Sequence, residues 1–157
     1  MFVKSSKKLG GLVLIGAIGA IVVLGATNTA ATESSNPTIP VTVNLTGVQI
    51  ADGPIYISVQ KREQYMGMKG HGIVLKTVTP GNMTATVNVT EPGDYSVSVW
   101  HDMDDDTVFD MDETYTPVEG WGASGTAPTD RMPTFEDVKI TVEPFGTELT
   151  IPVIYPS

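Results

Sequence analysis

The sequence predicts an all-β protein, folded as an antiparallel β-sandwich of about seven strands. Apolar and polar residues alternate in short runs rich in Val, Ile and Thr, which is the pattern of half-buried strands. Clusters of Gly, Pro, Asn and Asp separate these runs, as expected for turns. No stretch shows a convincing helical period, and short strands with frequent turns are typical of a sandwich.

The predicted strands follow one another along the chain. The alternating runs are residues 41–46, 55–60, 73–78, 84–90, 95–100, 138–143 and 149–154. Turns are predicted between them at residues 51–54, 80–82, 91–94 and 144–146. Pro152 lies in the last run, and because Pro has no backbone N–H to donate, this strand is expected at the edge of a sheet.

The N-terminal part has the pattern of an export signal. Lys4, Lys7 and Lys8 precede an apolar run over residues 9–24, and Thr29-Ala30-Ala31 fits a small-residue cleavage site. We therefore expect a signal peptide over residues 1–31, a linker over 32–38 and the β-sandwich domain over 39–157. The protein is then secreted, to the periplasm, the cell surface or the extracellular medium. Only an uncleaved N-terminal segment would attach it to a membrane.

Charge and composition exclude several classes of protein. The chain has 18 acidic and 9 basic residues, and three of the bases but no acid lie in residues 1–31. The mature part therefore has 18 acids and 6 bases, a net charge of −12. This charge argues against a nucleic-acid partner and against anionic membranes, which both require basic patches. Cys is absent, so thiol enzymes, zinc–thiolate sites and iron–sulfur sites are excluded.

Residues 102–113 contain seven carboxylates, and their spacing predicts a calcium site. With Asp102 as position 1, acids fall at positions 1, 3, 5, 9 and 12, close to the order of ligands in a twelve-residue calcium loop. Thr107 stands at position 6, where such a loop needs a positive φ that Gly adopts more easily. The alternative is a solvated acidic loop that only keeps the protein soluble. The predicted ligands are the Val108 carbonyl and the carboxylates of Asp102, Asp104, Asp106, Asp110 and, to close the loop, Asp112 or Glu113.

The stretch over residues 101–136 shows neither a strand period nor a helical period. It contains Phe109, Tyr115, Trp121 and Phe135, whereas disordered segments are poor in aromatic residues. We therefore predict an ordered excursion, pinned by aromatic side chains and by the ion. The aromatic residues form a small core under the loop, or Trp121 and Tyr115 are exposed beside a groove, as in a carbohydrate- or peptide-binding module.

Candidate catalytic residues are few. His101 next to Asp102 could act as the general base of a metal-dependent hydrolase, but neighbouring strand residues point to opposite faces, so a structural His is favoured. Ser124 lacks the spacing of a nucleophile elbow and follows no predicted strand. The sequence therefore predicts a protein that is not an enzyme.

Four sequence blocks carry a resemblance to a known family. They are GDYSVSVWHD at residues 93–102, DDDTVFD at 104–110, PVEGWGAS at 117–124 and PTFED at 133–137. Over residues 39–156 the chain resembles the secreted β-domain family catalogued as domain of unknown function 2141. Thr107 stands where the family usually has Gly, and Tyr115-Thr116 replaces a Gly-x pair. The resemblance implies a secreted β-sandwich of prealbumin-like or immunoglobulin-like type, and it implies no activity.

Together these observations predict a secreted, non-enzymatic β-sandwich protein with a calcium-ordered loop. Its role would be structural or in binding, at or outside the cell surface. Calcium is the one partner that the sequence indicates, and the sequence identifies no protein or glycan partner.

Overall fold

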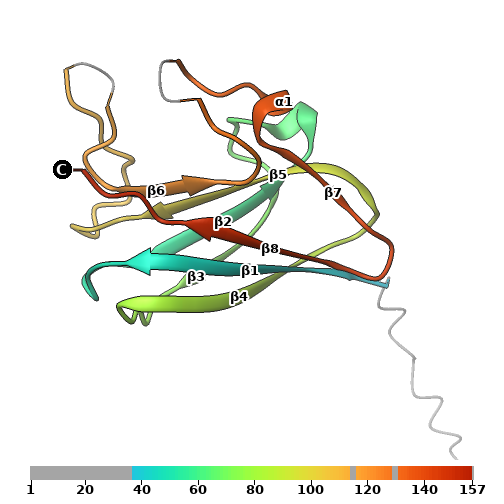
Figure 1. The fold of residues 1–157 in the computed structure, drawn as a ribbon, viewed down its shortest axis with the longest axis horizontal. Coiled ribbons are helices and arrows are strands. Elements are labelled where there is room, and N and C mark those ends of the chain that lie inside the picture. The colour runs from blue at the N-terminus through green and yellow to red at the C-terminus, as the bar shows by residue number, and fades with distance from the viewer. Residues whose placement is uncertain (1–36, 114–115, 129–130, 157) are drawn as a thin grey trace, which may run out of the picture. The chain divides into compact units, whose positions relative to one another are not determined.

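The computed structural model describes residues 37–113, 116–128 and 131–156, and these contain eight strands in two sheets (Figure 1). The first sheet has the order β4 (Gly81–Val89), β1 (Ile39–Val48), β8 (Thr147–Pro152). The second has the order β3 (His71–Leu75), β2 (Ile55–Gln60), β5 (Gly93–His101), β6 (Gly120–Ala123), and β7 (Lys139–Val142) also pairs with β5. The prediction of an all-β chain is confirmed.

Each predicted strand corresponds to a strand of the structure, and β6 is the additional one. It was not predicted because four residues with two glycines show no alternation. Two short helices, η1 (Arg62–Gln64) and α1 (Phe135–Val138), are likewise too short to give a helical period. β8 lies at the edge of its sheet, as Pro152 predicts.

The prediction of purely antiparallel pairing is wrong at β8. β1 and β8 pair in parallel, with Val41 opposite Thr147 and Thr46 opposite Pro152, whereas the other ladders are antiparallel. The chain leaves β7 in the second sheet and enters β8 in the first, so β8 is not the hairpin partner of its predecessor. Alternation reports which side chains are buried and carries no information on strand direction.

One cluster of buried apolar side chains includes residues from both sheets. On β1, Val41, Val43 and Leu45 have no exposed surface, while the residues between them point outward, as the alternation predicts. Burying each such side chain contributes about 1.5–3 kcal/mol, so this shared core dominates the stability of the fold. Other members of the cluster are Ile55, Ile57, Val59, Val87, Val89, Tyr95, Val97, Val99 and Ile151.

A backbone bridge joins the second sheet to the segment that follows β8. Trp121 of β6 and Ile154 exchange both hydrogen bonds, with N···O distances of 2.9 and 2.7 Å. β6 lies on the same edge of β5 as β7: β6 pairs with residues 98–101 and β7 with residues 93–96.

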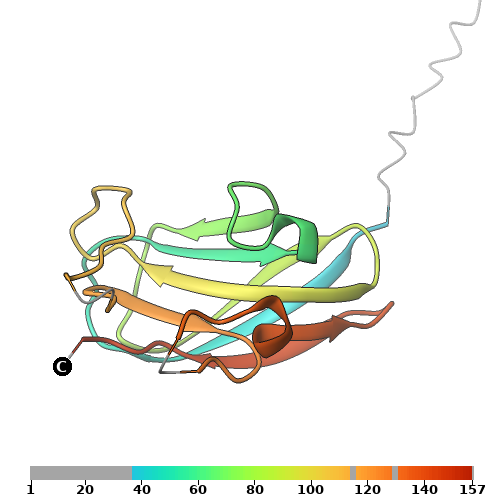
Figure 2. The same cartoon turned by 90° about the horizontal axis from the view of Figure 1, so that it is seen from above.

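Three connections project from one face of the second sheet (Figures 1 and 2). They are residues 61–70 with η1, the described parts of the acidic segment (102–113 and 116–119), and residues 124–128 and 131–138 with α1. All three contribute to the candidate site.

The N-terminal predictions concern residues outside the described part of the chain. The predicted signal peptide over 1–31 lies there entirely, as does most of the linker over 32–38. β1 begins at Ile39, the first residue of the predicted domain. Among the described residues, no helix has the length and apolar character needed to cross a membrane.

Candidate functional site

Asp102 organises the first half of the acidic loop. β5 ends at His101, and Asp102 directly after it is completely buried. Its backbone N–H donates to the carbonyl of Pro54 at 3.0 Å. Its two carboxylate oxygens accept the N–H groups of Asp106 at 3.2 Å and Thr107 at 3.0 Å. The loop therefore closes on the Asp102 side chain, and a buried carboxylate of this kind is held by charge-assisted hydrogen bonds.

The turn between β1 and β2 packs directly against this position. Gly53 has a φ of +73°, and a Cβ at this residue would lie 1.7 Å from the carbonyl oxygen of Asp102. No side chain fits there, so the contact requires Gly. Residues far apart in the sequence thus fix where the acidic loop begins.

The side chains of Asp102, Asp104 and Asp106 come together. One oxygen of each carboxylate lies within 4.8 Å of the others. The pKa of Asp104 is raised above its usual value, because the loop removes part of the hydration of its carboxylate and because the charge of Asp106 is close. Three oxygen donors at alternate positions of one loop are the ligand type that Ca²⁺ prefers, and a cation would relieve their mutual repulsion.

The backbone turn that a calcium loop requires at position 6 is present. Thr107 has a φ of +66° and Asp105 a φ of +59°. The left-handed conformation is uncommon for a β-branched residue such as Thr and is tolerated better by Asp. The N–H of Val108 then donates to Oδ1 of Asp106 at 2.7 Å. The sequence correctly indicates a strained turn at this residue.

The segment that follows the three-carboxylate cluster folds back on itself. Residues 110–112 pair with residues 116–118: Asp110 and Val118 share a backbone hydrogen bond, and Met111 pairs with Pro117. The Asp112 carboxylate accepts the N–H of Thr116 at 2.9 Å. Among the described Asp and Glu residues, the cluster contains none of Asp110, Asp112 and Glu113.

Glu119 is a buried residue of the candidate site that the sequence did not predict. Only 4% of its surface is exposed. Its Oε2 accepts the indole N–H of Trp100 at 2.6 Å and the N–H of Asp110 at 3.2 Å, and its Oε1 accepts the N–H of Met103 at 3.0 Å. Glu119 therefore ties the two stems of the acidic loop to each other and to β5. The sequence does contain one indication of its burial: within residues 117–124 this acid is flanked by apolar residues and Gly.

His101 is buried and hydrogen-bonded at both ring nitrogens. Nε2 donates to the carbonyl of Asp52 at 2.8 Å, since a carbonyl can only accept, and Nδ1 shares a hydrogen bond of 2.7 Å with the hydroxyl of Tyr155. Burial raises the pKa of Tyr155, and a hydrogen bond from the backbone of Gln49 opposes this effect. The side chain of His101 thus connects the start of β2 to the C-terminal segment.

Ser124 is also part of the structural hydrogen-bond network. It is buried, its Oγ accepts the N–H of Val97 at 2.9 Å and donates to the carbonyl of Val138. It therefore joins β5 to the end of α1 and is not an exposed nucleophile.

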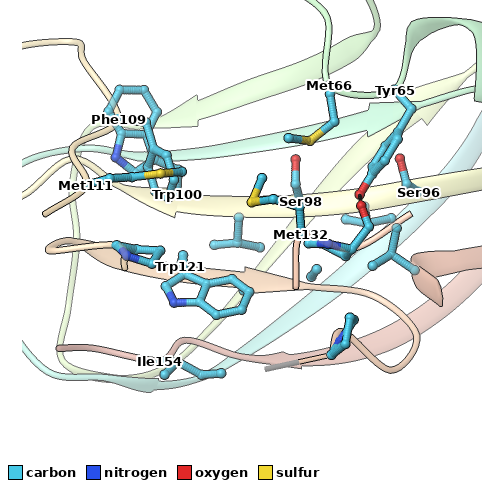
Figure 3. A pocket seen from close by; sticks show the side chains of 18 of the residues that line it. Tyr65, Met66, Ser96, Ser98, Trp100, Phe109, Met111, Trp121, Met132 and Ile154 are labelled. Carbon is cyan, nitrogen blue, oxygen red and sulfur yellow. Dashed lines mark hydrogen bonds between the residues drawn. The ribbon is translucent and has the colours of Figure 1, made fainter. Parts of the chain in front are cut away.

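A cavity of about 770 Å³ lies on the outer face of β5 and β6, between the three connections (Figure 3). Trp121 lines it, whereas Tyr115 lies outside the described residues. At one end Trp100 stacks on Tyr56, with ring centroids 4.6 Å apart, and meets the edge of Phe109 at 6.0 Å. Of the four aromatic residues in the predicted excursion, Phe109 and Trp121 line this cavity.

The other end of the cavity is held by residues near α1. Tyr65 donates its hydroxyl to the carbonyl of Pro133 at 2.9 Å, and its ring meets the buried ring of Phe135 edge-on. Arg131 forms a two-pronged ion pair with Asp137, at 2.7 and 2.9 Å. Hydrogen bonds from Arg131 and from Thr134 hold the pKa of Asp137 well below its usual range.

Comparison with protein families matches more than half of the chain. The family described as an uncharacterized protein conserved in bacteria, domain of unknown function 2141, matches residues 43–150. The chain belongs to this family. The resemblance predicted from the four sequence blocks is confirmed. In this family member the matched residues include Asp102, the acidic loop, Glu119 and most of the cavity lining. Comparison with curated proteins and with solved structures gave no match.

Proposed function

We propose that this member of the family is an exported, non-enzymatic β-sandwich of prealbumin-like or immunoglobulin-like type whose acidic loop binds Ca²⁺. Its role is structural or in binding, at or outside the cell surface. The observation that carries the proposal is the convergence of the Asp102, Asp104 and Asp106 carboxylates within 4.8 Å at alternate positions of a loop. The positive φ of Thr107 at position 6 supports it further.

Calcium would cross-link the loop through its ligands and would neutralise part of the negative charge of its carboxylates. Asp102, Asp104 and Asp106 are the ligands that the cluster supports. Ca²⁺ takes six to eight oxygens, so the Val108 carbonyl, Asp110 and one of Asp112 or Glu113 remain the proposed additional ligands.

A non-enzymatic role is supported by the surroundings of the candidate catalytic residues. The ring nitrogens of His101 are both hydrogen-bonded within a buried network, so neither is free to take a proton from a substrate. Ser124 is buried and hydrogen-bonded on both sides. A metal-dependent hydrolase would need an available base beside the acidic cluster.

The cavity favours a second role as a binding module. Small-molecule sites are concave and mostly apolar, with volumes of about 300–1,000 Å³. The cavity of about 770 Å³ beside Trp121 has these properties. Calcium binding and a binding role are compatible, because Phe109 and Met111 of the acidic loop line this cavity.

The calcium proposal is tested by thermal unfolding of the purified protein in chelator and in millimolar Ca²⁺. A weak site, with Kd on the order of 10⁻⁴ M, gives about 2.7 kcal/mol of stabilisation at one hundred times Kd. Asp104→Asn should abolish this gain. Asp105→Asn is the matched control, because it removes the same charge one residue away, outside the cluster, and Asn tolerates its positive φ. Equal melting temperatures in chelator and in Ca²⁺ would refute the proposal.

Export is tested separately by sequencing the N-terminus of the protein recovered outside the cytoplasm. The expected first residue lies within a few positions of Thr32. Recovery of the intact N-terminus in the membrane fraction would mean an anchor in place of a cleaved signal.

A further inference from the structure

We propose that the cavity on the outer face of β5 and β6 binds a small amphipathic cation, with an apolar, preferably aromatic body that carries one ammonium group. This inference deepens the proposed binding role and rests on it, but it does not require calcium.

The lining of the cavity selects an apolar body. Flexible methionine and aromatic side chains both line the space (Figure 3). Methionine adapts its shape to irregular apolar ligands, and aromatic rings add large contact areas. A volume of about 770 Å³ suits a small organic molecule. The methionine and aromatic side chains include Met66, Met111, Met132, Phe109 and Trp121.

Most polar groups of the lining already have protein partners. The Gln60 amide donates to the carbonyls of Gly67 at 2.8 Å and Lys69 at 2.7 Å, and Ser96 donates to the carbonyl of Gln60 at 3.3 Å. The Tyr65 hydroxyl and the Trp100 indole N–H are also hydrogen-bonded.

Few lining groups therefore remain to recognise a polar ligand. Among the described lining residues, the Ser98 hydroxyl and the Trp121 indole N–H have no side-chain hydrogen bond to the protein. A sugar, with its many hydroxyl groups, would leave most of them unpaired and would lose affinity for that reason. The lining is thus less suited to a carbohydrate than to a ligand with one polar group.

The charge of the surroundings selects a cation. Phe109 and Met111 belong to the segment that also carries the acidic cluster, and the mature chain has a net charge of −12. Among the described lining residues Arg131 is the single basic one, and its guanidinium is paired with Asp137. A negative potential concentrates cations and repels anions, and the face of an indole attracts an ammonium group. Trp121 offers such a face, since it lies along the cavity in Figure 3.

Fluorescence reports directly on this site, because both tryptophans of the chain, Trp100 and Trp121, line the cavity. The purified protein is titrated with phenylhexylamine, phenylhexanol and phenylhexanoate, which share one body and differ in the charge of the head group. We expect saturable changes in fluorescence, with the amine binding about tenfold more tightly than the carboxylate and the alcohol between them. The advantage of the amine should decrease with added salt.

A matched pair of variants locates the binding. Ser98 is exposed on the floor of the cavity, on the same face of β5 as Trp100 and diagonally across from Trp121, so Ser98→Leu fills ligand space beside both rings. Thr150→Leu makes a comparable change on an exposed position of β8 in the first sheet. Ser98→Leu should weaken amine binding about tenfold, which corresponds to 1.4 kcal/mol, and Thr150→Leu should leave it unchanged. Circular dichroism confirms that both variants are folded.

Each outcome tests a different part of the proposal. Equal affinity for the three probes would overturn the assignment of a cation and leave the binding role intact. No response to any probe would overturn both. Tight amine binding that survives Ser98→Leu would place the ligand outside this cavity. The calcium proposal is unaffected by these outcomes, since its own test is the change in melting temperature.

Discussion

Replacing Glu119 by Gln is the most informative single change, because it alters one atom of a buried group. Glu119 accepts three hydrogen bonds: the indole N–H of Trp100 and the N–H of Asp110 on Oε2, and the N–H of Met103 on Oε1. Gln has the same shape, but one of its terminal atoms is an NH₂ group that donates. If the amide oxygen faces Trp100 and Asp110, the NH₂ group faces the N–H of Met103, and two donors oppose each other.

The expected loss of stability follows from these contacts. An unsatisfied buried N–H costs about 1–3 kcal/mol, and hydrogen bonds to a charged acceptor are worth about 1 kcal/mol more than those to a neutral one. Glu119→Gln should therefore lower the free energy of unfolding by about 2–4 kcal/mol. This is a large fraction of the roughly 5–15 kcal/mol that stabilises a typical domain. For a domain of this size the melting temperature should fall on the order of 10 °C.

The measurement is urea and thermal unfolding in chelator, so that calcium does not contribute, followed by the fluorescence of Trp100 and Trp121. Glu113→Gln is the matched control, because Glu113 is exposed on the same loop and its replacement should change stability by less than about 0.5 kcal/mol. A Glu119→Gln protein as stable as this control would refute the claim that Glu119 holds the loop.

Three further predictions concern other contacts. Gly53→Ala should cost about 2–4 kcal/mol of unfolding free energy, because the added Cβ would overlap the carbonyl of Asp102. Gly81→Ala is the control: Gly81 also has a positive φ, but an added Cβ meets no atom within 4 Å, so this variant measures the cost of the positive φ alone. Tyr155→Phe should cost about 1–3 kcal/mol in urea unfolding, since it removes the hydroxyl and leaves Nδ1 of the buried His101 without that partner. The folded-state pKa of Asp137 is lowered, so its stabilisation is present above its ordinary pKa of 3.8 and is lost as the pH falls through the folded value. Asp137→Asn should accordingly flatten the decline in stability below about pH 4, and an unchanged decline would contradict this account.

The strands could be predicted because burial imposes a period of two on the sequence. Val41, Val43 and Leu45 are fully buried on β1 while Thr42 and Asn44 face outward, and this alternation can be recognised without knowing any partner strand. The direction of β8 could not be predicted in this way, because parallel and antiparallel neighbours bury the same alternate residues.

The sequence of β6 does not reveal why this strand requires a glycine. A Cβ at Gly122 would lie 2.6 Å from the carbonyl oxygen of Pro152, so the Gly allows the end of β8 to approach β6. Glycine also occurs in turns and linkers, so its presence alone does not predict a strand. Only the partner segment, thirty residues later, explains it.

The acidic cluster could be predicted because its three members are local. Asp102, Asp104 and Asp106 lie within five residues, and alternate spacing in one loop brings their side chains together. The contacts that fix the loop are non-local. Glu119 acts on Trp100 across nineteen positions, and Gly53 meets Asp102 from the turn before β2. These contacts depend on strand register, which the sequence pattern of one segment does not determine.

The acidic loop and the cavity share one support. The carboxylate of Glu119 binds the N–H groups of Met103 and Asp110 in the loop and the indole of Trp100, which packs against Phe109 at the cavity wall. A cation that ordered the loop would also act on this wall, because Phe109 and Met111 belong to both. Linkage requires that the effect be reciprocal: whatever factor calcium adds to ligand affinity, the ligand adds to calcium affinity. If calcium neutralised the loop, the affinity of an anionic ligand for the cavity would rise most and that of a cationic ligand least. The effect of calcium on the affinity of each probe therefore measures how strongly the loop charge acts on the cavity.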